Sequence, residues 1–411
     1  MTSLVVEPDQ VAAIAAAIAR APLVAFDLEF LSQERLVPEL CLIQVAWTQH
    51  AAFDAAAHAG GSPAPGPGPE PALALVDPLA VDVRPIVDAI AAHACAVAHA
   101  ARQDLQLLAT RFGASVRGIA DTQVMAAFAG LGDQIGLAAL AGELAGAALD
   151  KEHQWTDWAR RPLAPAQLAY AAADVRHLPA IHAELAARLG ERVAWARAES
   201  AAVAAEAEAA ARVTPETAWR QLGGTRGLDA AAFAAVVALA AWRQRIALEL
   251  DRPLGQVLND RALIDLGRQR PRSAEAVRAV KGLSPLARQR APELVAAIAG
   301  AAPMAAPVPA AWRPASLRAQ RWAEALVAIA QLASERTGVA ARLLATRADA
   351  EELARAVDER GLDAARELPA LTTWRREVLG ELWIGWLTGA LALIGDPAAP
   401  SGLGLVPLER R

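Results

Sequence analysis

Four acidic residues stand where a strand or a helix could present them to one site. Asp27 and Glu29 lie two positions apart in the apolar segment AFDLEF, and side chains two apart on a strand point to the same face. Two adjacent carboxylates in apolar surroundings repel each other and resist burial unless a cation neutralises them. Asp104, in RQDLQLL, falls in the first turn of an expected helix, a position that the helix dipole also favours for an acid.

The fourth acid accompanies the only tyrosine of the chain. In LAYAAADVRHL, Tyr170 precedes Asp174 by four positions, which places both side chains on one face of a helix. A phenol beside a carboxylate can place a water molecule or a metal ion, although a packed tyrosine near a surface acid has the same spacing.

A set of carboxylates without clustered cysteine or histidine matches hard, oxygen-preferring cations. Mg²⁺ or Mn²⁺ fits such ligands, whereas a thiolate zinc site lacks them. Because no serine or cysteine nucleophile accompanies the acids, they suggest a two-metal site, in which ions about 3.5–4 Å apart clamp an in-line phosphoryl displacement. The absence of GxxxxGK[ST] from the sequence argues against a P-loop nucleotide triphosphatase.

The segments that must position these acids alternate between strand and helix. The expected strands are LVAFDLEF, LCLIQVAW, ALALVDP and ACAVAHA, and the expected helices are VAAIAAAIAR, VRPIVDAIAAH and RQDLQLLATRFG. From about residue 120 onward the pattern is helical. This order predicts a three-layer α/β domain with a mixed sheet, in which the early strands pair as a meander.

Proline-rich segments divide the chain. Residues 60–71 predict an exposed flexible loop, and residues 299–314 predict a linker. Residues 214–298 and about 316–395 form two expected helical units. ALELDRPLGQVLNDRALIDLGR in the first is similar to LASERTGVAARLLATRADAEELAR in the second, which indicates a duplicated small all-α domain.

Charge is distributed unevenly along the chain. The net charge of −5 argues against simple coating of nucleic acid. Residues 1–213 carry 14 basic and 24 acidic side chains, whereas residues 214–298 carry 13 basic and 8 acidic ones. A cationic unit beside an acidic metal-using domain would attract a phosphate backbone. From this unit we select Arg243, Arg270 and Lys281 as candidate nucleic-acid contacts.

The sequence predicts a cytoplasmic protein that does not enter a membrane. Cys41 and Cys95 lie in apolar segments and are expected as reduced thiols. The first thirty residues lack the basic leader of a signal peptide, and no run of eighteen uncharged apolar residues suits a membrane span.

Five separated segments resemble, in order and spacing, the motifs of ribonuclease D. They are FDLEF, HAARQDLQLL, DTQVMAAFAG, LDKEHQWTDWARRPL and AYAAADVRHLPAI, and they span about residues 20–200. That family belongs to the DEDD exonucleases, in the branch with tyrosine in the third motif. WRQRIALELDRPLGQVLNDRALIDLGRQRP looks like the HRDC domain (helicase and ribonuclease D C-terminal). The resemblance implies a ribonuclease H-like 3′–5′ exonuclease domain at 1–205, a first HRDC domain at 206–298 and a second, degenerate HRDC-like domain at 312–395.

The resemblance also implies catalytic roles for the four acids and the tyrosine. Asp27 would bridge two divalent ions, Glu29 and Asp174 would hold the ion that activates water, and Asp104 would hold the second. Tyr170 would orient the attacking water, because a phenol with a pKa of about 10 is a weak base at neutral pH. The product would be a 5′-mononucleotide released from a 3′ end.

Further residues are candidates to contact RNA. His99 and Gln103 flank the Asp104 turn, and Lys151 and Trp155 precede the third motif, where they could contact a phosphate and stack on a base. Trp158 is expected in the core. The segment SQERLVPEL, after the first motif, has no aromatic residue of the kind that family members often carry there.

The expected partner is RNA with a free 3′ end, such as a tRNA precursor, and the chain is expected to be monomeric. One alternative is a 3′–5′ DNA exonuclease, because discrimination between RNA and DNA depends on contact with the 2′-hydroxyl. Another is a non-catalytic RNA-binding scaffold. The presence of all four acids favours an enzyme.

Overall fold

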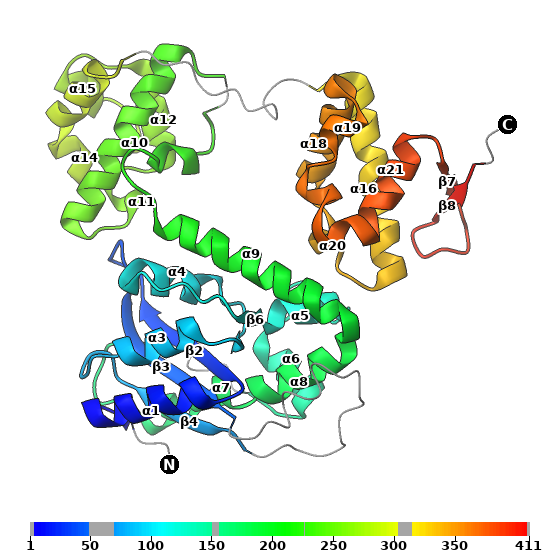
Figure 1. The fold of residues 1–411 in the computed structure, drawn as a ribbon. Coiled ribbons are helices and arrows are strands. Elements are labelled where there is room, and N and C mark those ends of the chain that lie inside the picture. The colour runs from blue at the N-terminus through cyan, green and yellow to red at the C-terminus, as the bar shows by residue number, and fades with distance from the viewer. Residues whose placement is uncertain (1–3, 49–69, 150–155, 226, 303–314, 409–411) are drawn as a thin grey trace.

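The chain folds into three domains, an N-terminal α/β domain and two helical domains (Figure 1). The structure is a computed structural model that describes residues 4–48, 70–149, 156–225, 227–302 and 315–408. We call residues 4–211 the N-terminal domain, residues 214–302 the middle domain and residues 315–408 the third domain. The expected loop at 60–71 lies almost wholly outside the described residues, as does most of the expected linker at 299–314.

A six-stranded mixed sheet forms the centre of the N-terminal domain. Its strands are β1 (Leu4–Val5), β2 (Val24–Leu31), β3 (Glu39–Trp47), β4 (Ala72–Val76), β5 (Ala96–Ala98) and β6 (Ile119–Asp121). They lie in the order β1-β4-β3-β2-β5-β6. Strands β2, β3 and β4 pair antiparallel, which confirms the expected meander, while β5 and β6 continue the sheet in parallel. The sequence interpretation missed β1 and β6, which are only two and three residues long.

Alternation along β2 sorts its side chains between the two faces of the sheet. Phe26 and Leu28 are buried in a core with α1 (Pro8–Arg20), α3 (Arg84–Ala92) and α4 (Arg102–Phe112). Asp27 and Glu29 therefore point to the other face. That face is covered by α5 (Thr122–Phe128), α6 (Leu137–Ala145), α7 (Pro165–Arg176) and α8 (Leu178–Leu189).

The helix α9 (Val193–Ala211) connects the three domains. It follows the short η1 (Gly190–Arg192), and its 19 residues span about 28 Å. Figure 1 shows it running across the N-terminal domain, from the side of the third domain to the side of the middle domain. The middle domain follows the C-terminal end of α9, and the third domain packs against its first half through Trp195 and Glu199.

The two helical domains begin with the same succession of helices. Helices α10 and α16 begin at Ala230 and Leu317, α11 and α17 at Leu254 and Ala341, and α12 and α18 at Asp260 and Arg347, a constant offset of 87 residues. Helices α10 and α16 are both 21 residues long, and α11 and α17 are both four residues long. This correspondence supports the predicted duplication.

The elements of the two helical domains have the following bounds. In the middle domain they are η2 (Ala218–Gln221), α10 (Ala230–Leu250), α11 (Leu254–Val257), α12 (Asp260–Gln269), α13 (Ala274–Arg278), α14 (Pro285–Gln289) and α15 (Ala291–Ala299). In the third domain they are α16 (Leu317–Thr337), α17 (Ala341–Leu344), α18 (Arg347–Arg360), α19 (Leu362–Ala365), η4 (Pro369–Leu371), α20 (Thr373–Arg375), η5 (Arg376–Gly380), α21 (Glu381–Leu387), β7 (Leu391–Gly395) and β8 (Leu403–Pro407).

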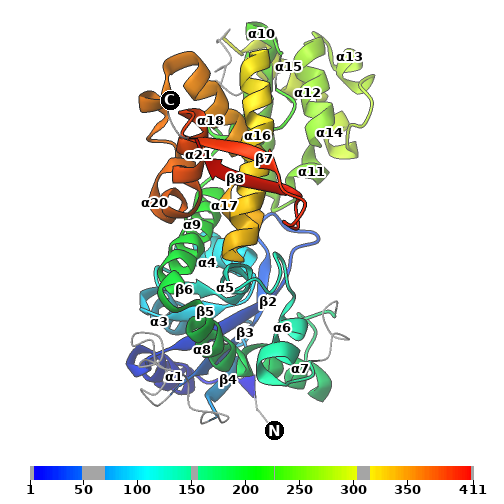
Figure 2. The ribbon, with the colours of Figure 1, turned by 90° about the vertical axis from the view of Figure 1, so that its right-hand side faces the viewer.

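Strands β7 and β8 correct the expectation that helix continues to residue 395. The two strands form an antiparallel hairpin that lies beside α16 in Figure 2. Leu393 and Leu405 pack against the core that the third domain shares with the N-terminal domain. The hairpin was missed because LALIG and LGLVP are short apolar runs, which periodicity alone does not distinguish from helix.

Each helical domain docks on the N-terminal domain through the corner that follows its long helix. In the middle domain the corner residue Asp251 has a left-handed backbone, with φ of +47°. Its Oδ1 accepts hydrogen bonds from the N–H groups of Leu36 and Val37 at 3.1 and 3.3 Å. Leu36 also packs against the middle-domain core. The loop that follows β2 is thus held by the middle domain.

The equivalent corner of the third domain docks at a different place. Gly338, 87 residues after Asp251, has a φ of +70°. Two residues later the Ala340 N–H donates to the Ala127 carbonyl at 3.1 Å, and Arg342 Nε lies 2.6 Å from Asp133 Oδ1. The same corner of the repeat therefore contacts the N-terminal domain twice, once in the loop after β2 and once at the end of α5 and the loop that follows it.

A single apolar core joins the third domain to the N-terminal domain. Trp374 stacks on Trp195 of α9, with ring centroids 5.7 Å apart, and meets Phe128 of α5 edge-on at 4.8 Å. The neighbouring Arg375 pairs with Glu199 at 2.8 Å, and both side chains are mostly buried. This interface resembles the interior of a domain, so we expect the two domains to unfold together.

One helix of the described residues is long and apolar enough to cross a membrane by length and composition. It is α10, and 67% of its apolar window is buried inside the protein. Its residues form the core of the middle domain, which explains the composition.

Replacing Trp374 with alanine should destabilise the N-terminal and third domains together. The change removes a large buried ring from the shared core, and such changes cost about 3–5 kcal/mol. Urea unfolding followed by circular dichroism and by intrinsic tryptophan fluorescence should show one shared transition moving to lower urea. Trp322→Ala, which removes a less buried ring of the same domain, should have a smaller effect. A third domain that unfolds separately in the wild-type protein would contradict the shared core.

Candidate active site

Three of the predicted acids converge between the sheet and α7. Asp27 and Glu29 come from β2 and Asp174 from α7. One carboxylate oxygen from each lies within 4.8 Å of the others. The strand supplies two acids on one face because its side chains alternate, and α7 lies across that face, so residues far apart in sequence meet at one point.

This proximity makes the carboxylates resist ionisation. Desolvation, followed by repulsion from Asp27 and Asp174, raises the pKa of Glu29 to about 9. Desolvation and the charge of Asp27 raise the pKa of Asp174 to about 8. Desolvation raises the pKa of Asp27 to about 7, against a lowering effect of the Leu28 backbone. The cluster therefore favours either bound protons or a cation.

Asp104 lies beside this cluster but is not one of the three closely spaced carboxylates. It stands in the first turn of α4 and is 7% exposed. Burial, followed by the charges of Asp27 and Glu29, raises its pKa well above the usual range. The four acids therefore share one electrostatic environment, with Asp104 approaching from a different element.

Tyr170 lies one helical turn before Asp174, as the sequence spacing predicts. Desolvation raises the pKa of its phenol, and the charges of Asp174, Glu29 and Asp27 raise it further. A hydrogen bond joins Tyr170 to Asp174 and lowers the pKa of that carboxyl. The phenol thus keeps its proton at neutral pH, which suits a donor or an orienting group and not a base.

These residues fit a divalent cation. The donors are carboxylate oxygens, which Mg²⁺ and Mn²⁺ prefer. The raised pKa values of Asp27, Glu29 and Asp174, caused first by desolvation, favour a bound cation that would neutralise them. Gln44 adds a further observation. It faces Asp27 across the β2–β3 ladder, is fully buried, and donates from Nε2 to Asp27 Oδ2 at 3.3 Å. Its Oε1 has no partner among the described residues.

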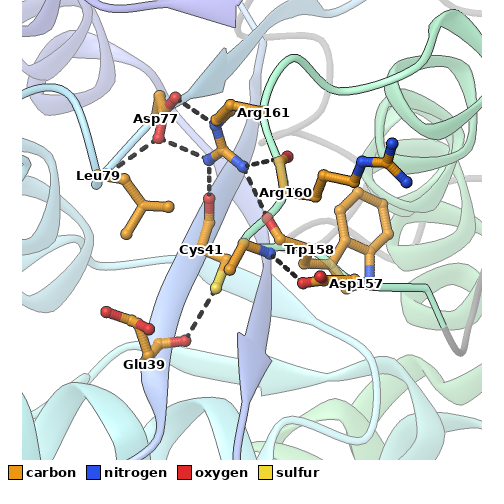
Figure 3. A network of polar contacts seen from close by, with 9 residues as sticks. Glu39, Cys41, Asp77, Leu79, Asp157, Trp158, Arg160 and Arg161 are labelled. Atoms are coloured by element: carbon orange, nitrogen blue, oxygen red, sulfur yellow. Dashed lines mark hydrogen bonds and ion pairs between the residues drawn. The ribbon is translucent and has the colours of Figure 1, made fainter.

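A partly buried arginine, Arg161, holds the segment that leads into α7 (Figure 3). Arg161 Nε and Nη2 each lie 2.6 Å from an oxygen of Asp77, the residue after β4. Nη2 also donates to the Cys41 carbonyl of β3, and Nη1 donates to the carbonyls of Trp158 and Arg160. All five N–H groups of the guanidinium are used. The segment is thereby tied to β3 and to the end of β4.

Trp158, within this segment, lies between the hydrogen bonds of Arg161 and the ring of Tyr170. It is 2% exposed, which confirms the expected core position, and its ring centroid lies 6.1 Å from that of Tyr170. Both rings belong to a small core with Leu163 and Ala171. The hydrogen bonds of Arg161 and this small core together hold the start of α7 on the sheet.

The structure separates the predicted RNA contacts into exposed and buried residues. Gln103 is exposed next to Asp104, and Arg270 and Lys281 are exposed on the middle domain. Arg270 pairs with Asp229 at 3.4 Å. Lys151 and Trp155 lie outside the described residues.

Two of the predicted RNA contacts need correction. Arg243 is 4% exposed and donates to the Leu258 carbonyl at 2.9 Å and to Asp260 at 2.6 Å. It stabilises the middle-domain core, and its charge was misread as a surface charge. His99 has both ring nitrogens engaged, with Thr122 Oγ1 at 2.9 Å and the Ile135 carbonyl at 3.0 Å. It fixes the turn before α4 and has no free nitrogen for RNA.

Sequence reasoning did not single out four residues that support the site. They are Gln44, Asp77, Asp121 and Arg161. Only two of them had a usable local signal. Gln44 is a polar residue within the apolar strand LCLIQVAW. Asp121 precedes a helix at a position typical of an N-cap. The pairing of Asp77 with Arg161 joins residues 84 apart and has no local signal.

Comparison with known proteins agrees with this arrangement. A family model described as 3′–5′ exonuclease matches residues 3–190, and an HRDC domain model matches residues 232–298. A protein of Acidiphilium cryptum named ribonuclease D is 35% identical over 402 residues, covering 95% of this chain and 94% of that protein. A ribonuclease D of Granulibacter bethesdensis is 33% identical over 406 residues, with coverage of 95% and 94%.

A solved structure extends the similarity to the whole fold. The crystal structure of Escherichia coli RNase D, described as an exoribonuclease involved in structured RNA processing, superposes with a TM-score of 0.77. It is 27% identical and covers 95% of this chain and 99% of that one. The fold, with its acidic cluster beside a helix-borne tyrosine, is that of a metal-dependent 3′–5′ exonuclease. This chain belongs to the ribonuclease D family and is a 3′–5′ exoribonuclease.

The metal-free protein should lose stability as pH rises. The pKa of Glu29 is raised from its ordinary 4.5 to about 9, so between these pH values the folded chain holds a proton that the unfolded chain releases. The free energy of unfolding should therefore fall from about pH 4.5 to about pH 9. Urea unfolding in EDTA at stepped pH would measure this slope.

Two changes should reduce that slope. Glu29→Gln removes one of the titrating groups, and saturating Mg²⁺ supplies the missing positive charge. Glu191→Gln, at an exposed position of η1, should leave the slope as it is. A metal-free wild-type protein whose stability is constant or rises over this range would contradict the electrostatic description of the cluster.

Proposed function

We propose that this exoribonuclease hydrolyses structured RNA from its 3′ end, tRNA precursors among its substrates, and releases 5′-mononucleotides at the site of Asp27, Glu29, Asp104, Tyr170 and Asp174. The observation that carries the assignment is the convergence of carboxylates from β2 and α7 within 4.8 Å. The description of Escherichia coli RNase D as acting in structured RNA processing supports the substrate class.

The four acids come from three elements, β2, α4 and α7, and would hold two ions between them. Glu29 and Asp174 would hold one divalent ion, Asp104 would hold a second, and Asp27 between them would contact both. Two Mg²⁺ or Mn²⁺ ions, when bound, supply a water of lowered pKa and neutralise charge on the leaving oxygen. Gln44 restricts the orientation of Asp27 through its hydrogen bond.

Tyr170 would orient the attacking water. Its raised pKa keeps the hydroxyl protonated, and its bond to Asp174 fixes the direction of the O–H group. With its hydrogen directed at Asp174, the phenol oxygen can accept a hydrogen bond from the water. A fixed acceptor beside the reacting centre contributes by orientation, because near-attack geometry supplies a large share of a hydrolytic rate.

The helical domains would guide the RNA strand towards this site. The middle domain has a positive balance of 13 basic to 8 acidic residues over 214–298, and Arg270 and Lys281 are exposed there. We assign the exonuclease domain to 1–205, the first HRDC domain to 206–298 and a second, degenerate HRDC-like domain to 312–395, supported by the 87-residue offset between their helices. We expect a cytoplasmic monomer.

Asp27→Asn should abolish Mg²⁺-dependent release of mononucleotides and leave RNA binding largely unchanged. The substitution keeps the shape of the side chain but removes the charge shared between the ions. Chromatography of products from matched RNA and DNA oligomers, with free and blocked 3′ ends, would follow the reaction in Mg²⁺ and in EDTA. Asp88→Asn, an exposed acid paired with Arg84, is the matched control and should retain full activity.

Three outcomes of that experiment would overturn the assignment. If Asp27→Asn retained turnover, the assignment of Asp27 to the catalytic site would be wrong. If mononucleotides were released equally from RNA with blocked and with free 3′ ends, the 3′–5′ direction of hydrolysis would be wrong. Faster release from DNA than from RNA would make the DNA exonuclease the better description.

Removing two exposed charges of the middle domain should weaken binding of long RNA and reduce its salt dependence. For the double variant Arg270→Ala/Lys281→Ala, each lost phosphate contact should lower the log–log salt slope by roughly 0.7. Filter binding of an inactive Asp27→Asn background at several salt concentrations would measure both quantities. Arg20→Ala/Arg84→Ala, on α1 and α3, is the matched pair and should change neither; equal slopes for the two pairs would exclude the middle-domain path.

A further inference from the structure

The buried carboxylate of Asp121 accepts hydrogen bonds from backbone N–H groups at the start of two helices. Asp121 ends β6, is 3% exposed and forms the N-cap of α5. Its Oδ1 accepts the N–H groups of Ala100 and Gln123, and its Oδ2 accepts the N–H of Ala101, all at 2.9 Å. An N-cap needs one such bond. The other two hold the turn that leads from β5 into α4.

That turn is in a conformation that alanine does not favour. Ala100 has a φ of +55°, a left-handed conformation that costs a non-glycine residue roughly 1–2 kcal/mol. Two charge-assisted hydrogen bonds to successive N–H groups can offset such a cost. His99, also in the turn, contacts Thr122, which itself donates to the Ala98 carbonyl at 3.2 Å. The turn is thus held by residues 121 and 122 together.

The turn decides where Asp104 lies. Ala101 immediately precedes α4, and Asp104 stands in the first turn of that helix. Asp27, Glu29 and Asp174 are placed by β2 and α7, whereas Asp104 reaches the site only through α4. A rotation of the first turn of α4 would therefore move Asp104 relative to the other acids without moving them.

We propose that Asp121 is a positioning residue of the exonuclease, which sets the place of Asp104 by holding the left-handed turn at Ala100 and Ala101. The proposal rests on the function proposed above, because it gives Asp104 a role at the site. The competing explanation is that Asp121 only caps α5 and contributes stability.

The central experiment combines loss of the carboxylate with relief of the turn. Asp121→Ala should lower kcat on a short RNA oligomer by about 100-fold, the loss expected for a misplacement of about 1 Å, with a much smaller change in KM. Adding Ala100→Gly to it should restore a substantial part of kcat, because glycine adopts positive φ without cost. Asp121→Asn should be intermediate, since it keeps an oxygen for Ala100 and Gln123 but loses the bond from Ala101.

The control is an N-cap remote from the site. Thr346 caps α18 by accepting the N–H of Asp349, so Thr346→Ala removes a cap of the kind worth about 1 kcal/mol. It should lower the unfolding midpoint and leave kcat unchanged. Equal loss of kcat in Asp121→Ala and Thr346→Ala at matched stability, or a rescue of stability by Ala100→Gly without rescue of kcat, would overturn the positioning role.

Two readouts do not require turnover. Amide hydrogen exchange at Ala100 and Ala101 should be slow in the wild-type protein and fast in Asp121→Ala, and calorimetric titration with Mn²⁺ alone should show weakened binding in that variant. If the wild-type chain released no mononucleotide, the proposed function would fail. The positioning of Asp104 would then be decided by these two measurements, and unchanged exchange and Mn²⁺ binding would refute it.

Discussion

Repulsion among the carboxylates of Asp27, Glu29 and Asp174 is the constraint around which the N-terminal domain is built. Three acids within 4.8 Å of one another hold protons at pH values where isolated acids would lose them. The fold has to keep them together despite this cost. It does so with two rigidly held elements. Strand β2 is paired with a strand on each side, and the segment before α7 is hydrogen-bonded to β3 and to the residue after β4.

In both ties a charged side chain forms several hydrogen bonds, most of them to backbone groups. Arg161 uses all of its N–H groups on Asp77 and on three carbonyls, and Asp121 receives three backbone N–H groups. Such bonds to charged groups are stronger than neutral ones, and leaving any partner unmatched in a buried place is costly. Rigidity is therefore concentrated at the turns before α4 and α7, the two helices that carry acids to β2.

Much of this arrangement was predictable from local patterns. The face shared by Asp27 and Glu29 follows from a period of two, and that of Tyr170 and Asp174 from a spacing of four. The meander follows from three apolar runs separated by loops. Patterns of this kind report how a side chain is directed within its own element.

Contacts between distant segments escaped prediction for the same reason. Arg243 sits in a segment rich in surface arginines, and only the packing of α10 against α12 shows it to be buried. The pair of Asp77 with Arg161 and the docking of Asp251 on Leu36 join segments 84 and 215 residues apart. The hairpin of β7 and β8 is made of short apolar runs, which periodicity alone does not distinguish from helix.

The two copies of the corner are not interchangeable at their docking positions. Both copies keep a left-handed residue after the long helix, yet Asp251 offers a carboxylate where Gly338 offers no side chain. Exchanging the copies would leave the N–H groups of Leu36 and Val37 without the acceptor that Asp251 provides. The middle domain therefore carries a docking residue that the third domain lacks, although the helices of the two domains still follow the same pattern.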